Sequence, residues 1–123
     1  MKTNFTTQVQ ISSAALLLKV ASSDDKTDLI ELNEIEEILY DYFDLSKSQS
    51  QDILKNAKIE VEKSIDIFNF GEILNNSFDK EDKIEFVKCV LDVAHADDHY
   101  DHRERHLVSK IADILNLTKE DYL

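Results

Sequence analysis

The feature that most constrains this chain is an acidic motif that occurs twice in the same register. The pattern V-A-x-x-D-D-x-x-D-x-x-E begins at Val20 and again at Val93, and each copy has an isoleucine at the same later position, Ile38 or Ile111. After one extra residue in the first copy, F-D-L-S at 43–46 corresponds to L-N-L-T in the second. Because internal repeats indicate copies of one supersecondary unit, we predict two helix–acidic turn–helix units related by a pseudo-twofold axis.

Residues that form tight turns are nearly absent, with one glycine and no proline among 123 residues. Hairpins and strand-rich folds use glycine and proline at their turns. Apolar residues instead recur at spacings of three and four, which is typical of amphipathic helices. We therefore predict an all-α fold, a compact bundle of six or seven helices. Its length fits one domain spanning 1–123, with residues 1–6 frayed.

The predicted helices begin and end near residues that cap helices. They span about 7–22, 29–43, 47–63, 67–74, 80–96 and 102–116, with a capped turn at 118–121. Ser46 with Gln49 has capping-box spacing, and Asp79 is a candidate cap. The helix at 80–96 has apolar residues around much of its circumference, which predicts the central buried position. Gly71 costs a helix about 1 kcal/mol relative to alanine, and it indicates a close approach by a neighbouring backbone.

The overall charge excludes several kinds of partner. A net charge of -12 argues against nucleic acid, whose phosphates require clustered lysine and arginine, and against anionic membrane surfaces. The leucines at 16–18 form too short a run to span a bilayer, and we expect no signal peptide, because the N-terminus lacks a basic region followed by an apolar run. Cys89, the single cysteine, fits a reducing compartment and suits a small buried hydrophobe. We expect a cytoplasmic protein without membrane insertion.

The acidic motifs have a purely structural interpretation. Asp28 with Glu31 and Asp101 with Glu104 have the spacing of capping boxes, each contributing about 1 kcal/mol. The Asp-Asp pairs that precede them would then form the turns. This alternative assigns no ligand to either motif.

The second interpretation is a cation site. Two acidic turns brought together would offer carboxylate oxygens to calcium or magnesium. An EF-hand is excluded, because Ile35 and Val108 stand where its bidentate glutamate is required. His102 and His106 lie four residues apart, a spacing that suits zinc on one helix face. The candidate metal ligands are Asp24, Asp28, Glu31, Asp97, Asp98, Asp101, Glu104, His102 and His106.

Motifs of catalysis are missing from the sequence. It contains no glycine-rich phosphate loop, no G-x-S-x-G and no H-E-x-x-H, since the glutamate between His102 and His106 is displaced by one residue. We therefore expect no enzymatic activity and no cofactor other than a divalent cation.

The repeated motif resembles that of the TerB-like family, which includes tellurite-resistance protein B and the N-terminal domain of a DnaJ-type co-chaperone. The family motif reads A-x-A-D-G-x-x-D-x-x-E, often twice; here positions 21–31 read A-S-S-D-D-K-T-D-L-I-E and positions 94–104 read A-H-A-D-D-H-Y-D-H-R-E. Similarity also extends over 64–75 and 111–117. The resemblance covers nearly the whole chain after Ser12. It implies an all-α fold and an association with stress or metal resistance.

By this resemblance, the family's acidic positions are Asp24, Asp28, Glu31, Asp97, Asp101 and Glu104, whereas the histidines are not carried over. Asp25 and Asp98 stand where the family has glycine. Aspartate adopts a left-handed turn less readily than glycine. Either the turn differs, or the added carboxylate strengthens cation binding.

We conclude with two hypotheses. The first is a cytoplasmic, TerB-like, non-enzymatic module that responds to cations or binds a partner, linked to stress or tellurite resistance. The alternative is a metal-independent protein–protein interaction module of co-chaperone type, with an apolar groove for an unknown partner. The sequence names neither the ion, the partner nor the oligomeric state.

Overall fold

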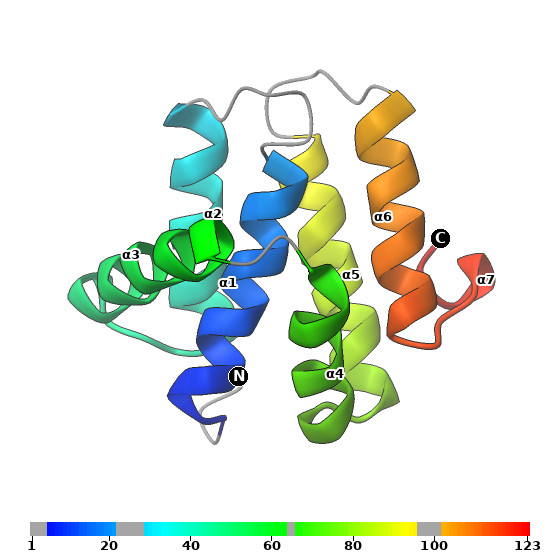
Figure 1. The fold of residues 1–123 in the computed structure, drawn as a ribbon, viewed down its shortest axis with the longest axis horizontal. Coiled ribbons are helices and arrows are strands. Elements are labelled where there is room, and N and C mark those ends of the chain that lie inside the picture. Colours follow the sequence, from blue (N-terminus) through cyan, green and yellow to red (C-terminus); the bar gives the residue numbers. More distant parts are fainter. Residues whose placement is uncertain (1–4, 22–28, 64–65, 96–101) are drawn as a thin grey trace.

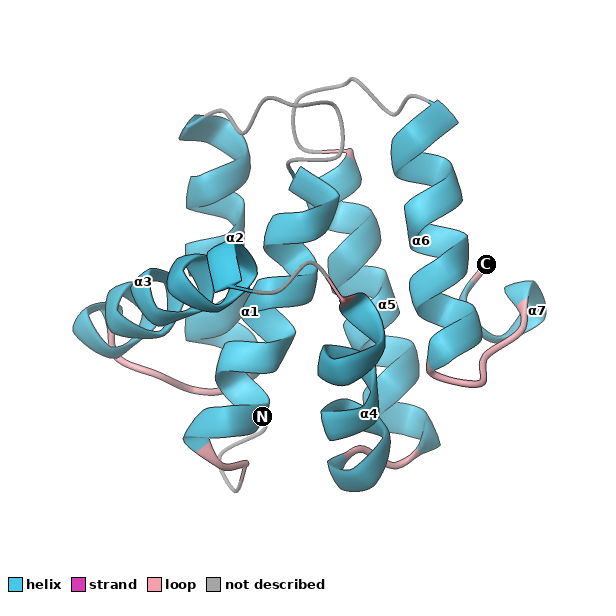
Figure 2. Ribbon diagram, in the orientation of Figure 1, coloured by secondary structure: helices cyan, strands magenta, loops and turns pink. Residues whose placement is uncertain are grey.

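Seven helices make up the described part of the chain. The computed structural model describes residues 5–21, 29–63, 66–95 and 102–123, with 29–31 and 102–104 described by their backbone only. The helices are α1 (Thr7–Ala21), α2 (Leu29–Tyr42), α3 (Lys47–Lys63), α4 (Ile67–Ser77), α5 (Lys80–Ala94), α6 (His102–Ile114) and α7 (Lys119–Tyr122) (Figure 1). No strand occurs in these ranges (Figure 2), so the all-α prediction is confirmed.

Helix α1 occupies the centre of the bundle. It packs against α2, α3, α4, α5 and α6 (Figure 1). The prediction that the helix at 80–96 is central was therefore wrong. Lys19 is the only charged residue of α1, and its small residues at 12–15 are buried, which lets neighbours approach from several sides. The buried Ser13 hydroxyl donates to the Val9 carbonyl oxygen over 2.9 Å, so burial leaves this donor satisfied.

Aromatic rings pack together between the start of α1 and the helices α2 and α5. The ring centroid of Phe5 lies 4.9 Å from that of Phe78 and 6.0 Å from that of Phe43. Thr6 Oγ1 accepts a hydrogen bond from the Val9 N–H at 3.3 Å, which caps α1. Phe5 and Thr6 make these contacts, and residues 1–4 lie outside the described part, so the expected fraying of residues 1–6 stays a prediction.

The two copies of the predicted repeat end in similar backbone geometry. Asp44 and Asn116, which correspond in the repeat, are the described non-glycine residues with positive φ, at 54° and 64°. The next residues, Leu45 and Leu117, each donate their N–H to the carbonyl oxygen five residues earlier, over 3.1 and 2.9 Å. This is the Schellman pattern of helix termination. The relation of the two copies by an axis stays a prediction.

Side-chain hydrogen bonds mark the starts of α3, α5 and α7. The predicted box at Ser46 is present: its N–H donates to Gln49 Oε1 at 2.8 Å, and the Gln49 N–H donates to Ser46 Oγ at 3.1 Å. Asp79 caps α5 as predicted, in a reciprocal box with Asp82. Before α7, the Thr118 N–H and hydroxyl both donate to Asp121 Oδ2, at 2.8 and 3.2 Å. Local side-chain chemistry therefore sets these helix starts.

Helices α4 and α6 touch at the single glycine. A Cβ on Gly71 would overlap Ile114 Cγ2, so the predicted close approach is real, but the neighbour is a side chain and not a backbone. One turn later, Asn75 Nδ2 donates to the Ile114 carbonyl oxygen at 2.8 Å. This bond satisfies a carbonyl at the end of α6, where no helical partner is available.

Candidate functional site

Four helix ends that flank the acidic motifs lie at one end of the bundle. These are the C-terminal ends of α1 and α5 and the N-terminal ends of α2 and α6 (Figure 1). Each acidic motif spans the connection between two of these ends, and we call this part of the molecule the acidic end. The N-termini of α2 and α6 carry the positive ends of their helix dipoles, which favour negative charge nearby.

Most of the predicted ligands lie where side chains are not described. Outside the described residues are Asp24, Asp28, Asp97, Asp98 and Asp101. Described by their helical backbone only are Glu31, His102 and Glu104. His106 is exposed on α6, and among the side chains that the structure describes no group of three or more His, Cys, Asp or Glu could hold a metal ion. Metal binding by these nine residues stays a prediction.

A groove between α2 and α5 was not anticipated from the sequence. Its volume is about 320 Å³, and the buried residues Ile38 and Tyr42 line it together with the partly buried Cys89. Five carboxylates also line this α2–α5 groove, namely Glu34, Glu37, Asp41, Glu85 and Asp92. No lysine or arginine is found among the described residues that line it. The groove therefore combines an apolar floor with acidic walls.

Helical spacing explains how the acids come together. On α2, Glu34, Glu37 and Asp41 follow one another at three and four residues; on α5, Glu85 and Asp92 are seven residues apart. Such spacings place side chains on one helix face. The sequence contains this signal on each helix, but only the packing of α2 against α5 shows that the two stripes border the same groove.

The groove environment opposes negative charge. Partial burial, then Asp92 and Glu37, raise the pKa of the Glu34 carboxyl above its usual range. Burial, followed by Asp92 and Glu85, raises the pKa of the Cys89 thiol to about 12. The sulfur therefore stays protonated at neutral pH, which makes it a poor nucleophile. This arrangement suits binding of a cationic group better than covalent chemistry.

Tyr42 ties the groove to the start of α5. Its hydroxyl donates to the Asp82 carbonyl oxygen over 2.8 Å. Burial is the main cause that raises the pKa of Tyr42, and nearby Asp82 adds to it. The phenol is therefore a neutral, fixed part of the floor.

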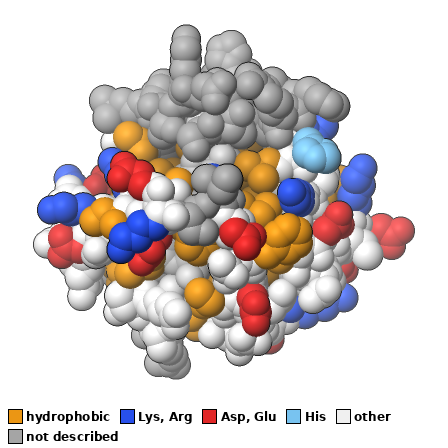
Figure 3. Space-filling model, viewed as in Figure 1, with side chains coloured by type: hydrophobic (Ala, Val, Ile, Leu, Met, Phe, Trp, Pro, Cys, Tyr) orange, Lys and Arg blue, Asp and Glu red, His pale blue; other side chains and the backbone are white. Residues whose placement is uncertain are grey.

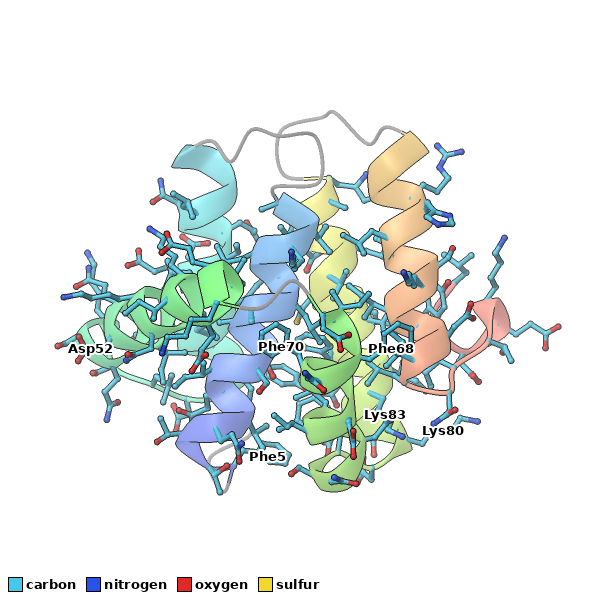
Figure 4. The ribbon with its side chains drawn as sticks, viewed as in Figure 1. Phe5, Asp52, Phe68, Phe70, Lys80 and Lys83 are labelled. Carbon is cyan, nitrogen blue, oxygen red and sulfur yellow. The ribbon has the colours of Figure 1, made fainter. Side chains whose placement is uncertain are left out.

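Hydrophobic and charged side chains are interspersed on the face of the molecule that Figure 3 shows. Phe68 of α4 is 56% exposed, and Lys110 Nζ of α6 lies 5.6 Å from its ring centroid, within cation–π range. Figure 4 shows the Phe68 side chain on α4. A separate depression of about 450 Å³ is lined by Ile11, Phe70 and Ile73 together with polar residues. Apolar surface for a partner thus exists outside the α2–α5 groove.

Comparison with known proteins identifies the family. A family model described as tellurite resistance protein TerB matches residues 10–123. No curated protein matches the chain. A crystal structure of a protein of unknown function from Porphyromonas gingivalis has a TM-score of 0.75 and 17% identity, covering 97% of this chain and 83% of that one. At this identity the likeness shows a shared fold.

None of the helices in the described ranges has the length and apolar character to cross a bilayer. The family match spans the chain from the first helix to its last residue and includes both copies of the acidic motif. The chain therefore belongs to the family of tellurite resistance protein TerB.

Proposed function

We propose that this chain is a non-enzymatic, cation-responsive binding module of the cytoplasm, linked to stress or tellurite resistance, whose acidic end binds a divalent cation. One observation carries the proposal: the helix ends that flank both copies of D-D-x-x-D-x-x-E lie at the same end of the bundle. Each acidic segment joins two of these helix ends in the sequence. Membership of the TerB family supports the link to tellurite resistance.

The chemistry of the motif favours a hard cation. Each copy contributes three aspartates and one glutamate, and calcium is bound by six to eight oxygen atoms, which carboxylates commonly supply. His102 and His106 add nitrogen donors that suit zinc. Calcium or magnesium should therefore depend on the aspartates, whereas zinc should depend on the histidines as well.

Calorimetric titration of metal-free protein with calcium, magnesium and zinc tests the proposal. We expect heat of binding and a rise in melting temperature, because a ligand at 100 times its dissociation constant stabilises the folded state by about 2.7 kcal/mol. Asp24→Asn with Asp97→Asn should abolish both effects. The matched control is Asp52→Asn with Asp113→Asn, which removes the same charge from exposed positions on α3 and α6. No heat and no melting shift at about millimolar metal would leave the acids with a capping role only.

The double variant also reports on the metal-free state. If the acids crowd an empty site, neutralising Asp24 and Asp97 relieves repulsion and raises the free energy of unfolding. If they cap helices or form turns, the same change lowers stability or leaves it unchanged. Thermal melting in chelator separates these two results.

The second candidate is a metal-independent interaction module. It is favoured by the exposed ring of Phe68 and by the separate depression lined by Ile11, Phe70 and Ile73, since exposed apolar surface marks interaction sites. This candidate predicts partner binding that persists in chelator. A pull-down performed with and without chelator, on wild-type protein and Phe68→Ser, distinguishes it from the cation-responsive module.

A further inference from the structure

We propose that the α2–α5 groove is a docking site for a basic segment of a partner protein, whose arginine or lysine side chains lie along Ile38 and Tyr42 and pair with the carboxylates of the walls. This site lies within the described part of the molecule and does not depend on cation binding at the acidic end. It assigns a partner chemistry that neither the family match nor the motif provides.

The first argument is that four of the five carboxylates in the acidic walls lack a compensating cation within the described part of the chain. Among the described residues, no lysine or arginine forms an ion pair with Glu34, Glu37, Asp41 or Asp92. An ion pair does occur elsewhere in the described part, between Lys80 Nζ and Asp121 Oδ1 at 3.4 Å. Like charges three or four residues apart on a helix repel one another. A cationic occupant would convert this repulsion into attraction.

The second argument is the chemistry of the floor. Ile38 and Tyr42 are 7% and 9% exposed, and with Cys89 they form an apolar surface beneath the carboxylates. Arginine and lysine side chains match this arrangement, because each has an apolar stem and a charged end group. The stem would cover the floor and the head would reach the walls.

The third argument is size. A volume of about 320 Å³ is near the lower limit of small-molecule pockets, roughly 300 Å³. The groove therefore has room for a few side chains of the partner, and the partner's backbone lies outside it. From Glu34 to Asp41 the acidic stripe extends about 10 Å along α2, at 1.5 Å per residue. A partner helix with basic residues at i, i+3 and i+7 has the same spacing.

Other occupants fit less well. A metal ion is disfavoured, since the described residues offer no group of three ligands that could hold one. A second copy of this chain would carry the same net charge of -12 and be repelled. The same charge steers a basic segment toward the molecule and raises its association rate.

Fluorescence anisotropy with a labelled twelve-residue helical peptide tests the proposal, with arginine at i, i+3 and i+7 and alanine or leucine elsewhere. We expect Glu34→Gln, Glu37→Gln and Asp92→Asn together to weaken binding at least about tenfold. The matched control is Glu62→Gln, Glu72→Gln and Asp113→Asn, which removes three charges from exposed positions on α3, α4 and α6. The control should weaken binding less than about twofold, since distant exposed charges are screened by salt.

Several outcomes would overturn the proposal. Equal weakening by both triple variants would show general attraction to a negatively charged protein, and no binding by wild type would remove the site. Amide NMR shifts on peptide addition should centre on Ile38 and Cys89; shifts centred on Phe68 would place the peptide elsewhere. Sedimentation that shows self-association without a response to peptide would favour a second copy as the occupant.

The experiment also separates this site from the acidic end. Peptide binding should be the same in chelator and in calcium, and the groove variant should keep the calorimetric response to metal. Two results would show that the two sites are one, contrary to this proposal. The first is loss of the metal response in the groove variant, and the second is loss of peptide binding in Asp24→Asn with Asp97→Asn.

Discussion

Gly71 of α4 lies against Ile114 of α6 so closely that any Cβ at position 71 would overlap Ile114 Cγ2. Glycine is a poor helix former, and replacing it with alanine in a free helix gains about 1 kcal/mol. Here the contact between two helices opposes that gain. Gly71 is therefore a packing residue, although it carries no side chain.

Gly71→Ala should lower the free energy of unfolding by up to about 2 kcal/mol, because overpacking costs about 1–3 kcal/mol and the gain in helix propensity offsets about 1 kcal/mol of that cost. Chemical denaturation measures the change. Ile114→Ala removes the overlapping methyl group, so the double variant should lose less stability than the two single changes added together. A Gly71→Ala protein that is more stable than wild type would contradict the packing interpretation.

Tyr42→Phe should reduce stability by about 1 kcal/mol, the usual contribution of a hydrogen bond, because it removes the buried bond to the Asp82 carbonyl oxygen. The matched control is Tyr40→Phe. Tyr40 is 52% exposed, and the loss of its hydroxyl should leave the unfolding midpoint unchanged. Equal effects of the two changes would argue that the Tyr42 hydroxyl contributes nothing specific.

Glu34 should make the protein more stable as the pH falls from neutrality. Partial burial, Asp92 and Glu37 raise the pKa of this carboxyl in the folded state. At a pH between the unfolded-state pKa and the folded-state pKa, the native protein therefore binds more protons than the unfolded chain. Stability from this group is fully present below the unfolded pKa and is lost as pH rises through the folded pKa.

Glu34→Gln should accordingly raise stability at pH 7 by about 0.5 kcal/mol, the size of one like-charge pair, and flatten the pH profile in this window. Urea denaturation from pH 4 to pH 7 provides the comparison. Glu62→Gln, an exposed change on α3, should leave the profile as it is. A decrease in stability for Glu34→Gln at pH 7 would reverse the sign that the groove predicts.

Cys89 should react slowly with iodoacetamide at pH 8, because a thiol with a pKa of about 12 is almost entirely protonated there. Relative to a free cysteine with a pKa of about 8.5, we expect the rate to fall by more than about 100-fold. Neutralising Glu34, Glu37 and Asp92 should speed the reaction, since Asp92 and Glu34 contribute to the shift. Alkylation at the rate of a free thiol would show that Cys89 is neither buried nor surrounded by acids.

The starts and ends of helices were predictable where the deciding chemistry is local. Ser46 with Gln49 and Asp79 with Asp82 form the reciprocal bonds that begin helices, and such caps involve residues only a few positions apart. The fifth and sixth helices end at Ala94 and Ile114, two residues before the predicted ends, because apolar periodicity continues past the last hydrogen-bonded turn. Family membership was also readable, since the repeated acidic motif is a pattern along the chain.

The candidate site was predictable only in part. The acidic motifs and His106 follow from spacing, and the helix ends around them lie together. The α2–α5 groove was not foreseen, because the glutamates of α2 have the pattern of a solvated helix face and nothing local indicates that Glu85 and Asp92 of α5 lie opposite.

Amino-acid order alone was enough for the helical class, the capped helix starts and the doubled acidic motif, because each depends on residues within a few turns of one another. The packed bundle was needed to show that α1 and not α5 is central, that Gly71 meets Ile114, and that acids from two helices share one groove. Those facts depend on which helix faces meet across the bundle, and the pairing of faces depends on the burial summed over the helices of the described part.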